Sequence, residues 1–192
     1  YLSMSQGFGY GARGYASGGI GAIFDLGGDD RYEAGEFSQG CGYAWAMGLI
    51  HDFAGSDAYH GNRYSQAAAA HQAIGMLIDD AGDDDYWSMT AASQSGSWDQ
   101  SITMLIDRAG NDAYRCDGLG QGSAAQQSVA VLIDLGGEDR YRAAGGANAS
   151  AQGCGGGNEY HYAADRMLSF SMLMDLGASG GDWFSTGRKA TV

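Results

Sequence analysis

The stretch VAVLIDLGGEDRY, residues 129–141, decides the fold, because its pattern recurs six times along the chain. In its first half, a pair of mostly apolar residues precedes an aspartate. The six copies are Ile23-Phe24-Asp25, Ile50-His51-Asp52, Leu77-Ile78-Asp79, Leu105-Ile106-Asp107, Leu132-Ile133-Asp134 and Leu173-Met174-Asp175. Successive aspartates are separated by 27, 27, 28, 27 and 41 residues. A fixed period of this length predicts one structural unit per repeat, stacked on its neighbours.

The second half of the pattern is Gly-x-Asp-x-aromatic, and all six copies keep it: Gly28/Asp30/Tyr32, Gly55/Asp57/Tyr59, Gly82/Asp84/Tyr86, Gly110/Asp112/Tyr114, Gly137/Asp139/Tyr141 and Gly180/Asp182/Phe184. A glutamine follows seven or eight residues later in four copies, at Gln39, Gln66, Gln94 and Gln121, whereas Gln152 comes four places late. We expect the aromatic residues to stack as a ladder and the glutamines to form side-chain amide ladders. The long fifth interval predicts a loop inserted at about 153–165.

Apolar and small residues alternate before each aspartate. Val129, Val131 and Ile133 are apolar, whereas Ser128 and Ala130 are small. A period of two indicates a strand, and strands of successive repeats about 4.8 Å apart would form a parallel sheet. A pair of helices does not fit into 27 glycine-rich residues, and a propeller blade needs about 40. The sequence therefore predicts an all-β, single-domain parallel β-helix (β-solenoid), right-handed, with about six coils of 27 residues over residues 1–192.

Two features of these strands leave their orientation open. A leucine or isoleucine two places before each aspartate departs from strict alternation, which predicts either burial on both faces or a bend. The far side of the strands carries a row of small residues: Gly21, Gly48, Gly75, Thr103, Ala130 and Ser171. Either parallel strands simply tolerate small residues there, or another layer packs closely on the row, which would then be a partner surface.

The composition excludes several functional classes. Among 192 residues there are 34 glycines and no proline, and the net charge of −13 disfavours binding to nucleic acid phosphates or anionic lipids. No apolar run reaches the ~18 residues that a membrane-spanning helix needs. The three cysteines, Cys41, Cys116 and Cys154, form no CxxC pair and no Cys/His cluster, so they predict no disulfide framework.

The Gly-x-Asp-x-aromatic stretch resembles half of the calcium-binding nonapeptide of the repeats-in-toxin proteins, Gly-Gly-x-Gly-x-Asp-x-hydrophobic-x. The resemblance covers about a fifth of each repeat and occurs once per 27 residues instead of in tandem. It implies calcium at the turns, held by carboxylate and carbonyl oxygens. The expected metal ligands are Asp25, Asp30, Asp52, Asp57, Asp79, Asp84, Asp107, Asp112, Asp134 and Asp139.

Electrostatic repulsion gives an independent reason to expect a cation. Carboxylates ~4.8 Å apart repel each other by roughly 1 kcal/mol in bulk water and by ~3.5 kcal/mol at an effective dielectric constant of about 20. The repulsion is greatest in one acidic cluster, which is therefore the first-choice site: Asp79, Asp80, Asp83, Asp84 and Asp85. The alternative is that the aspartates fix their turns without an ion, by accepting hydrogen bonds from backbone N–H groups two residues on.

Paired aspartates can also act on a glycosidic bond. A catalytic site should be singular, however, and these aspartates recur in every repeat. We therefore expect no enzyme, and a carbohydrate-binding or carbohydrate-active β-helix, of the polysaccharide lyase or hydrolase type, is the alternative. Its ligand would be sought on the inserted loop, which carries a cluster of varied polar and aromatic side chains: Asn158, Glu159, Tyr160 and His161.

The favoured function is a structural, adhesive or protein-interaction module stiffened by calcium. The expected partners are other protein chains or further copies of this chain, reached through the solenoid ends or the small-residue row. Carbohydrate is a further class of partner, and nucleic acid and a membrane span are not expected. Neither end of the chain resembles the polar cap that terminal coils need, so we expect a piece of a longer solenoid or end-to-end contact. The expected location is extracellular or on the cell surface.

Overall fold

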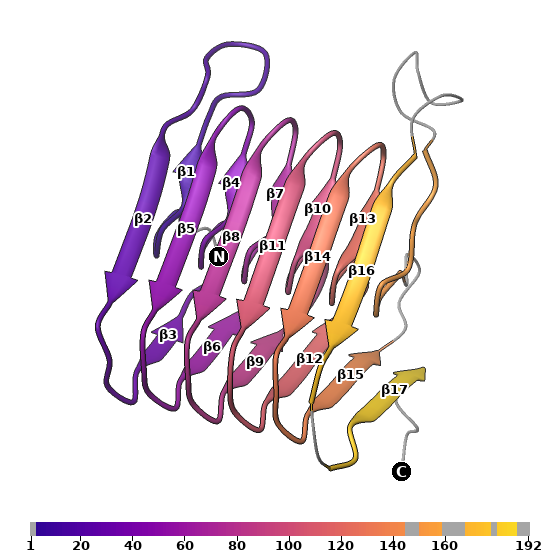
Figure 1. The fold of residues 1–192 in the computed structure, drawn as a ribbon. Coiled ribbons are helices and arrows are strands. Elements are labelled where there is room, and N and C mark those ends of the chain that lie inside the picture. The colour runs from indigo at the N-terminus through magenta and orange to yellow at the C-terminus, as the bar shows by residue number, and fades with distance from the viewer. Residues whose placement is uncertain (1–2, 145–149, 159–167, 178–179, 188–192) are drawn as a thin grey trace.

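The computed structural model describes residues 3–144, 150–158, 168–177 and 180–187. They form a parallel β-solenoid of about five turns, with coils of about 27 residues and no helix in the described part (Figure 1). The predicted fold class is confirmed. A search of the same residues for a helix long and apolar enough to cross a membrane found none.

The coils build three parallel sheets, two of six strands and one of five (Figure 1). Sheet 1 contains β2 (Ile20–Asp25), β5 (Met47–Asp52), β8 (Ile74–Asp79), β11 (Ile102–Asp107), β14 (Val129–Asp134) and β16 (Phe170–Asp175). Sheet 2 contains β3 (Arg31–Glu33), β6 (Ala58–Gly61), β9 (Asp85–Ser88), β12 (Ala113–Asp117), β15 (Arg140–Ala144) and β17 (Trp183–Gly187). Sheet 3 contains β1 (Gly9–Tyr10), β4 (Gly42–Tyr43), β7 (Ala69–Ala70), β10 (Gly96–Trp98) and β13 (Ser123–Ala125).

The strands are in register with the sequence repeat. In sheet 1 the aspartate at the end of each strand pairs with its equivalent in the next coil, as Asp79 does with Asp107. In sheet 2 the tyrosines pair in the same way, and five successive ring contacts have centroid distances of 4.7–5.0 Å with nearly parallel planes. The predicted aromatic ladder is therefore confirmed. It forms the core together with one aliphatic residue per coil, such as Leu77 or Leu105, which is fully buried.

The structure settles which side of each sheet 1 strand faces the core. The leucine or isoleucine two places before each aspartate points inward with the small residue and the aspartate, whereas Val129 and Ile133 point outward. The outward side chains of these strands are partly buried or exposed, apart from Val131, which is 8% exposed, so burial of both faces is not general. Sheet 3 of the same chain packs on the small row: a Cβ atom on Gly48 would lie 2.0 Å from the carbonyl oxygen of Cys41. The small-residue row is therefore internal, and the expectation that it is a partner surface is wrong.

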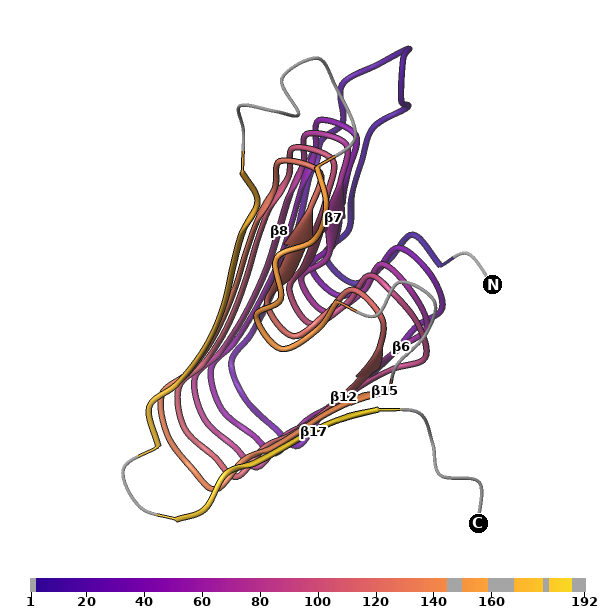
Figure 2. The same cartoon turned by 90° about the vertical axis from the view of Figure 1, so that its right-hand side faces the viewer.

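The coil is not a ring with three equal sides. Figure 2 shows that, after sheet 2, the chain turns back toward sheet 1 and then runs along it as sheet 3. The glutamines lie at this turn, where the Gln66 Nε2 donates to the carbonyl oxygens of Tyr59 and Trp87 at 2.6 and 2.8 Å. The glutamine row thus joins neighbouring coils mainly through backbone carbonyls, and an amide-to-amide bond is formed between Gln121 and Gln94.

The start of the predicted insertion at about 153–165 follows the regular coil. Gly155 forms a bridge with Ala124, and the Gly156 N–H donates to the Ala124 carbonyl at 2.8 Å, as a further sheet 3 segment would. These contacts continue the sheet 3 pattern as far as Gly156, and residues 159–165 of the expected loop lie outside the described residues.

Candidate cation sites at the aspartate turns

Two aspartates lie at the turn that joins sheet 1 to sheet 2 in every coil. The first aspartates end the sheet 1 strands: Asp25, Asp52, Asp79, Asp107, Asp134 and Asp175. The second aspartates precede the sheet 2 strands: Asp30, Asp57, Asp84, Asp112, Asp139 and Asp182. A glycine between them allows the turns to stack directly, because a Cβ atom on Gly82 would lie 1.5 Å from the carbonyl oxygen of Gly55. That glycine also has a φ of 150°, which other residues rarely adopt.

The carboxylates of the buried first aspartates are satisfied by hydrogen bonds on both oxygens. The Asp79 Oδ1 accepts the backbone N–H of Ala81, two residues on, at 3.2 Å. Its Oδ2 accepts the hydroxyl of Tyr59, from the preceding coil, at 2.7 Å. The same pair of contacts recurs at Asp52, Asp107 and Asp134. The turn-fixing role expected from the sequence is therefore confirmed for this row.

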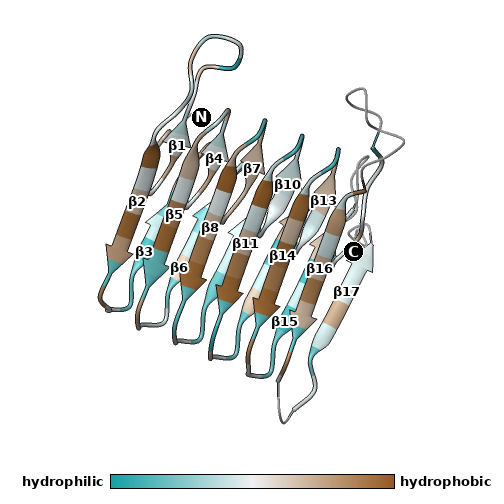
Figure 3. Ribbon diagram, turned by 45° about the horizontal axis from the view of Figure 1, so that its top comes forward, coloured by the Kyte–Doolittle hydropathy of each residue, from teal (hydrophilic) through white to brown (hydrophobic). Residues whose placement is uncertain are grey.

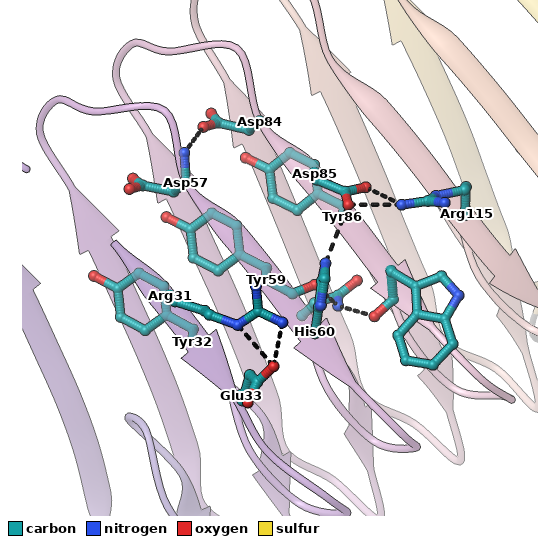
Figure 4. Close-up of polar contacts among 12 residues, drawn as sticks. Arg31, Tyr32, Glu33, Asp57, Tyr59, His60, Asp84, Asp85, Tyr86 and Arg115 are labelled. Carbon is teal, nitrogen blue, oxygen red and sulfur yellow. Dashed lines mark hydrogen bonds and ion pairs between the residues drawn. The ribbon is translucent and has the colours of Figure 1, made fainter. Parts of the chain in front are cut away.

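The second aspartates are held by one oxygen only. The Asp84 Oδ1 accepts the backbone N–H of Asp57 at 2.6 Å, so each such carboxylate bridges to the coil before it (Figure 4). The other oxygen, Oδ2, is buried without a hydrogen-bond partner in Asp57, Asp84, Asp112 and Asp139. These four side chains are at most 2% exposed. A buried charged oxygen without a partner is costly, so this row requires either protons or a cation.

The two rows come together as triads. The described residues contain five groups of three aspartates whose oxygens lie within 4.8 Å of one another. The groups are Asp25/Asp30/Asp52, Asp57/Asp79/Asp84, Asp84/Asp107/Asp112, Asp112/Asp134/Asp139 and Asp139/Asp175/Asp182. Every aspartate predicted as a metal ligand belongs to one of them. The triads are therefore stacked acidic sites that could hold cations.

Burial raises the pKa values of these carboxyl groups. For Asp57, loss of contact with water is the largest cause, followed by the opposing effect of the Asp30 backbone hydrogen bond, and the pKa rises to about 7. The pKa of Asp84 and that of Asp112 are raised for the same first reason, with the charge of a neighbouring first aspartate next in order. Burial also raises the pKa of the first aspartates Asp79 and Asp107, to about 6 and about 8, and the hydrogen bonds from tyrosine hydroxyls oppose this rise.

The acidic cluster chosen from the sequence does not form one site. Asp79 and Asp84 lie in a buried triad. Asp80, on the outside, contacts His51 and Arg108, and Asp85 contacts His60 and Arg115 (Figure 4). The Asp83 Oδ1 accepts hydrogen bonds from Asn111. Neighbours in sequence alternate between the inside and the outside of the coil here, so a run of acidic residues is divided between two surfaces.

Sequence reasoning left two triad members out of the metal ligands. Asp175 and Asp182 close the stack after Asp139, and both stand in the intact repeat pattern, which was the signal that could have placed them.

Of the residues expected to bind a ligand on the inserted loop, the structure describes Asn158. The Asn158 Oδ1 accepts the Gln127 N–H at 2.8 Å and the Ser169 hydroxyl at 2.6 Å, which is a structural role. The other expected ligand-binding residues, Glu159, Tyr160 and His161, lie outside the described residues.

Comparison with known proteins identifies no family for this chain. No family model matches the chain, and no curated protein or solved structure shows a significant match.

Proposed function

We propose that this chain is a structural and protein-interaction solenoid module whose aspartate turns hold a row of calcium ions. The unpartnered Oδ2 atoms of the second aspartates carry the proposal. A cation in each triad would be coordinated by these buried oxygens, which otherwise have no partner. The resemblance of the turns to the calcium-binding nonapeptide supports the same assignment.

The chemistry of the triads favours calcium over transition metals. All the donor atoms are carboxylate oxygens, with no histidine or cysteine in any of the five groups. Calcium prefers oxygen ligands and takes six to eight of them, so backbone carbonyls or water would complete the shell. Extracellular modules bind calcium with dissociation constants of about 0.1–1 mM. We therefore propose an extracellular or cell-surface location, where a weak site of this kind is useful.

The proposed module is a scaffold and not an enzyme. The aspartates repeat the same contacts from coil to coil, whereas a catalytic pair needs one position that differs from the others. Their function is then to fix the spacing of the coils. Removing the cation should loosen the turns and leave the sheets in place.

Thermal unfolding followed by circular dichroism tests the proposal. Saturating calcium should raise the melting temperature by about 5–10 °C over chelator, and magnesium at equal ionic strength should not reproduce the rise. Asp112→Asn, which alters two of the five triads, should reduce the shift. Asp117→Asn makes the same charge change on an exposed side chain and should leave it intact. An identical melting temperature in calcium and chelator would reject the calcium assignment.

A second candidate function, carbohydrate binding, rests on the outer face of sheet 2. Two adjoining hollows of about 460 and 310 Å³ share Trp87 and Met89 in their walls. Trp87 is 37% exposed, and an exposed tryptophan offers an apolar face on which a sugar ring can stack. Arg115 and Arg142 line the smaller hollow. Arg115 pairs with Asp85, whereas Arg142 has no acidic partner within the described residues and is the cation offered to an acidic sugar, beside Asp117 and Glu33 in the walls of the two hollows.

Titration calorimetry with an oligomer of uronic acids tests the second candidate, with a neutral oligosaccharide of equal length beside it. Binding should be lost in Trp87→Ala. It should be retained in Trp45→Ala, which removes an exposed tryptophan outside both hollows. No heat from either sugar with the unaltered chain would remove this candidate and leave calcium binding unaffected.

A further inference from the structure

The outer face of sheet 1 is an exposed apolar surface. Side chains point outward at every second position from Ile20 to Leu26 and at the equivalent positions of the other five strands. All of them are apolar except His51, Asp80 and Arg108. Figure 3 shows the hydrophobic colouring along these strands. Ile20 is 77% exposed, so in the single chain this face meets water.

The three polar residues on the face neutralise one another. The Asp80 Oδ2 lies 3.1 Å from the His51 Nε2, and the Asp80 Oδ1 lies 2.8 Å from a guanidinium nitrogen of Arg108. The His51 ring also stacks on Phe53 with a centroid distance of 3.9 Å. The face therefore has almost no net charge, although the whole chain carries −13. A surface from which charge is excluded in so acidic a protein indicates contact with another apolar surface.

The face is large enough for a stable interface. Six strands at about 4.8 Å and seven residues at about 3.3 Å span roughly 29 by 23 Å, or about 650 Å². Two such faces would bury about 1,300 Å² together, above the ~1,000 Å² that a specific interface needs. Single soluble proteins rarely expose one apolar patch of more than about 600 Å².

We propose that a second copy of this chain docks on the outer face of sheet 1, sheet against sheet. The copy has a face that is equally flat, equally apolar and equal in strand spacing, so the side-chain rows of one sheet fit between those of the other. Two sheets pack in this way about 10 Å apart, with their strands rotated by about 30°. A two-fold dimer uses the same face on both chains and closes after two copies. This proposal does not depend on calcium at the turns.

Sedimentation velocity over a range of concentrations tests the dimer. The unaltered chain should sediment as a dimer at about 10 μM, and Met104→Lys, in the middle of the face, should weaken dimerisation at least about a hundredfold. Met76→Lys, one strand away, should do the same. Ala113→Lys places the same charge on the outer face of sheet 2 in the same coil as Met104 and should leave the dimer intact.

Circular dichroism on each variant verifies that the solenoid is folded, and chelator in every run separates this contact from any cation at the turns. A monomer at about 100 μM for the unaltered chain would overturn the proposal. So would a dimer that survives in both folded lysine variants of the face. Assembly that continues beyond two copies would indicate contact through the solenoid ends and would overturn it as well.

Discussion

The first and second aspartates of each turn are the same residue type, five positions apart in the first five coils, yet their carboxylates are held differently. Asp107 has a tyrosine hydroxyl on one oxygen and a backbone N–H on the other. Asp112 has a backbone N–H on one oxygen and nothing on the other. The buried first aspartates from Asp52 to Asp134 are thus satisfied without a ligand, whereas the buried second aspartates have an unpartnered oxygen, as does Asp175 at the end of the first row.

The difference arises from what each row faces across the coil. The first aspartates lie opposite the hydroxyl ends of the tyrosine ladder, and these hydroxyls come from the preceding coil, as Tyr86 does for Asp107. The second aspartates stack above one another, so the neighbours that approach them are further carboxylates. Each of these turns therefore places a carboxylate with two hydrogen-bonded oxygens five residues before one with an unpartnered oxygen.

The largest expected effect comes from removing a first aspartate. Asp107→Ala leaves the buried Tyr86 hydroxyl and the part-buried Ala109 N–H without an acceptor, and should cost about 3–5 kcal/mol of unfolding free energy. Asp112→Ala leaves one N–H without an acceptor and also removes the free oxygen, so it should cost much less. Urea unfolding in chelator measures both. Equal losses of unfolding free energy in the two variants would show that the two rows of aspartates do not differ in their contribution to stability.

The pH dependence in chelator is the next largest effect. An unfolded aspartate has a pKa near 3.9, whereas burial raises the pKa of Asp57 to about 7 in the folded chain. The folded state then binds more protons between these values, so stability is full below about pH 4 and is lost as the pH rises through 7. We expect a loss of roughly 2–4 kcal/mol between pH 4.5 and 7.5.

Saturating calcium should flatten this pH dependence, because a cation replaces the protons at neutral pH. Urea unfolding at a series of pH values, with and without calcium, measures the effect. Stability that rises with pH in chelator would contradict the raised pKa values.

A smaller loss of stability should follow when a first aspartate loses one hydrogen bond and so has an unpartnered oxygen, as the second aspartates do. Tyr86→Phe keeps the ring stack but removes the hydroxyl that the Asp107 Oδ2 accepts, so that oxygen becomes unpartnered. The expected loss is about 1.5–3 kcal/mol in chelator at neutral pH. Calcium should recover more of this loss than it recovers for Phe184→Leu, a ring change at the end of the ladder. A loss that is the same with and without calcium would show that the new free oxygen binds no ion.

The fold could be predicted because the repeat fixes the register. Six copies spaced by 27 or 28 residues, apart from the interrupted fifth interval, leave little choice about which residues stack. The side of each sheet 1 strand could not be predicted, because one face is apolar apart from His51 and the other alternates small residues with leucine or isoleucine. Apolar residues usually face the core, but here Val129 and Ile133 face outward, and the tight approach of sheet 3 requires small residues inside. A shift of one residue exchanges the faces, and only the third layer settles which is correct.

The aspartates were recognisable as a set, but their division into two rows was not. The Tyr59 hydroxyl reaches Asp79 across 20 residues, and the pattern of one repeat contains no trace of that contact. The hollow around Trp87 was missed for a related reason, because its walls come from three different coils. Contacts between coils decide both sites, whereas sequence patterns describe positions within one coil.

The smallest expected effect distinguishes the first row of aspartates from the second most directly. In Asp112→Asn the amide oxygen still accepts the Asp84 N–H, and the amide nitrogen takes the place of the free oxygen among the carboxylates of Asp107 and Asp134. The amide nitrogen donates there without taking up a proton, whereas burial raises the pKa of Asp112 and requires the carboxyl group to bind a proton when the chain folds at neutral pH. The variant should therefore gain about 1 kcal/mol in chelator at neutral pH. Asp107→Asn, the matched change in the first row, should lose stability because its amide nitrogen replaces an acceptor that a buried donor needs. Urea unfolding of the two variants compares the signs directly, and a loss of stability in both would mean that the Asp112 oxygen is already satisfied.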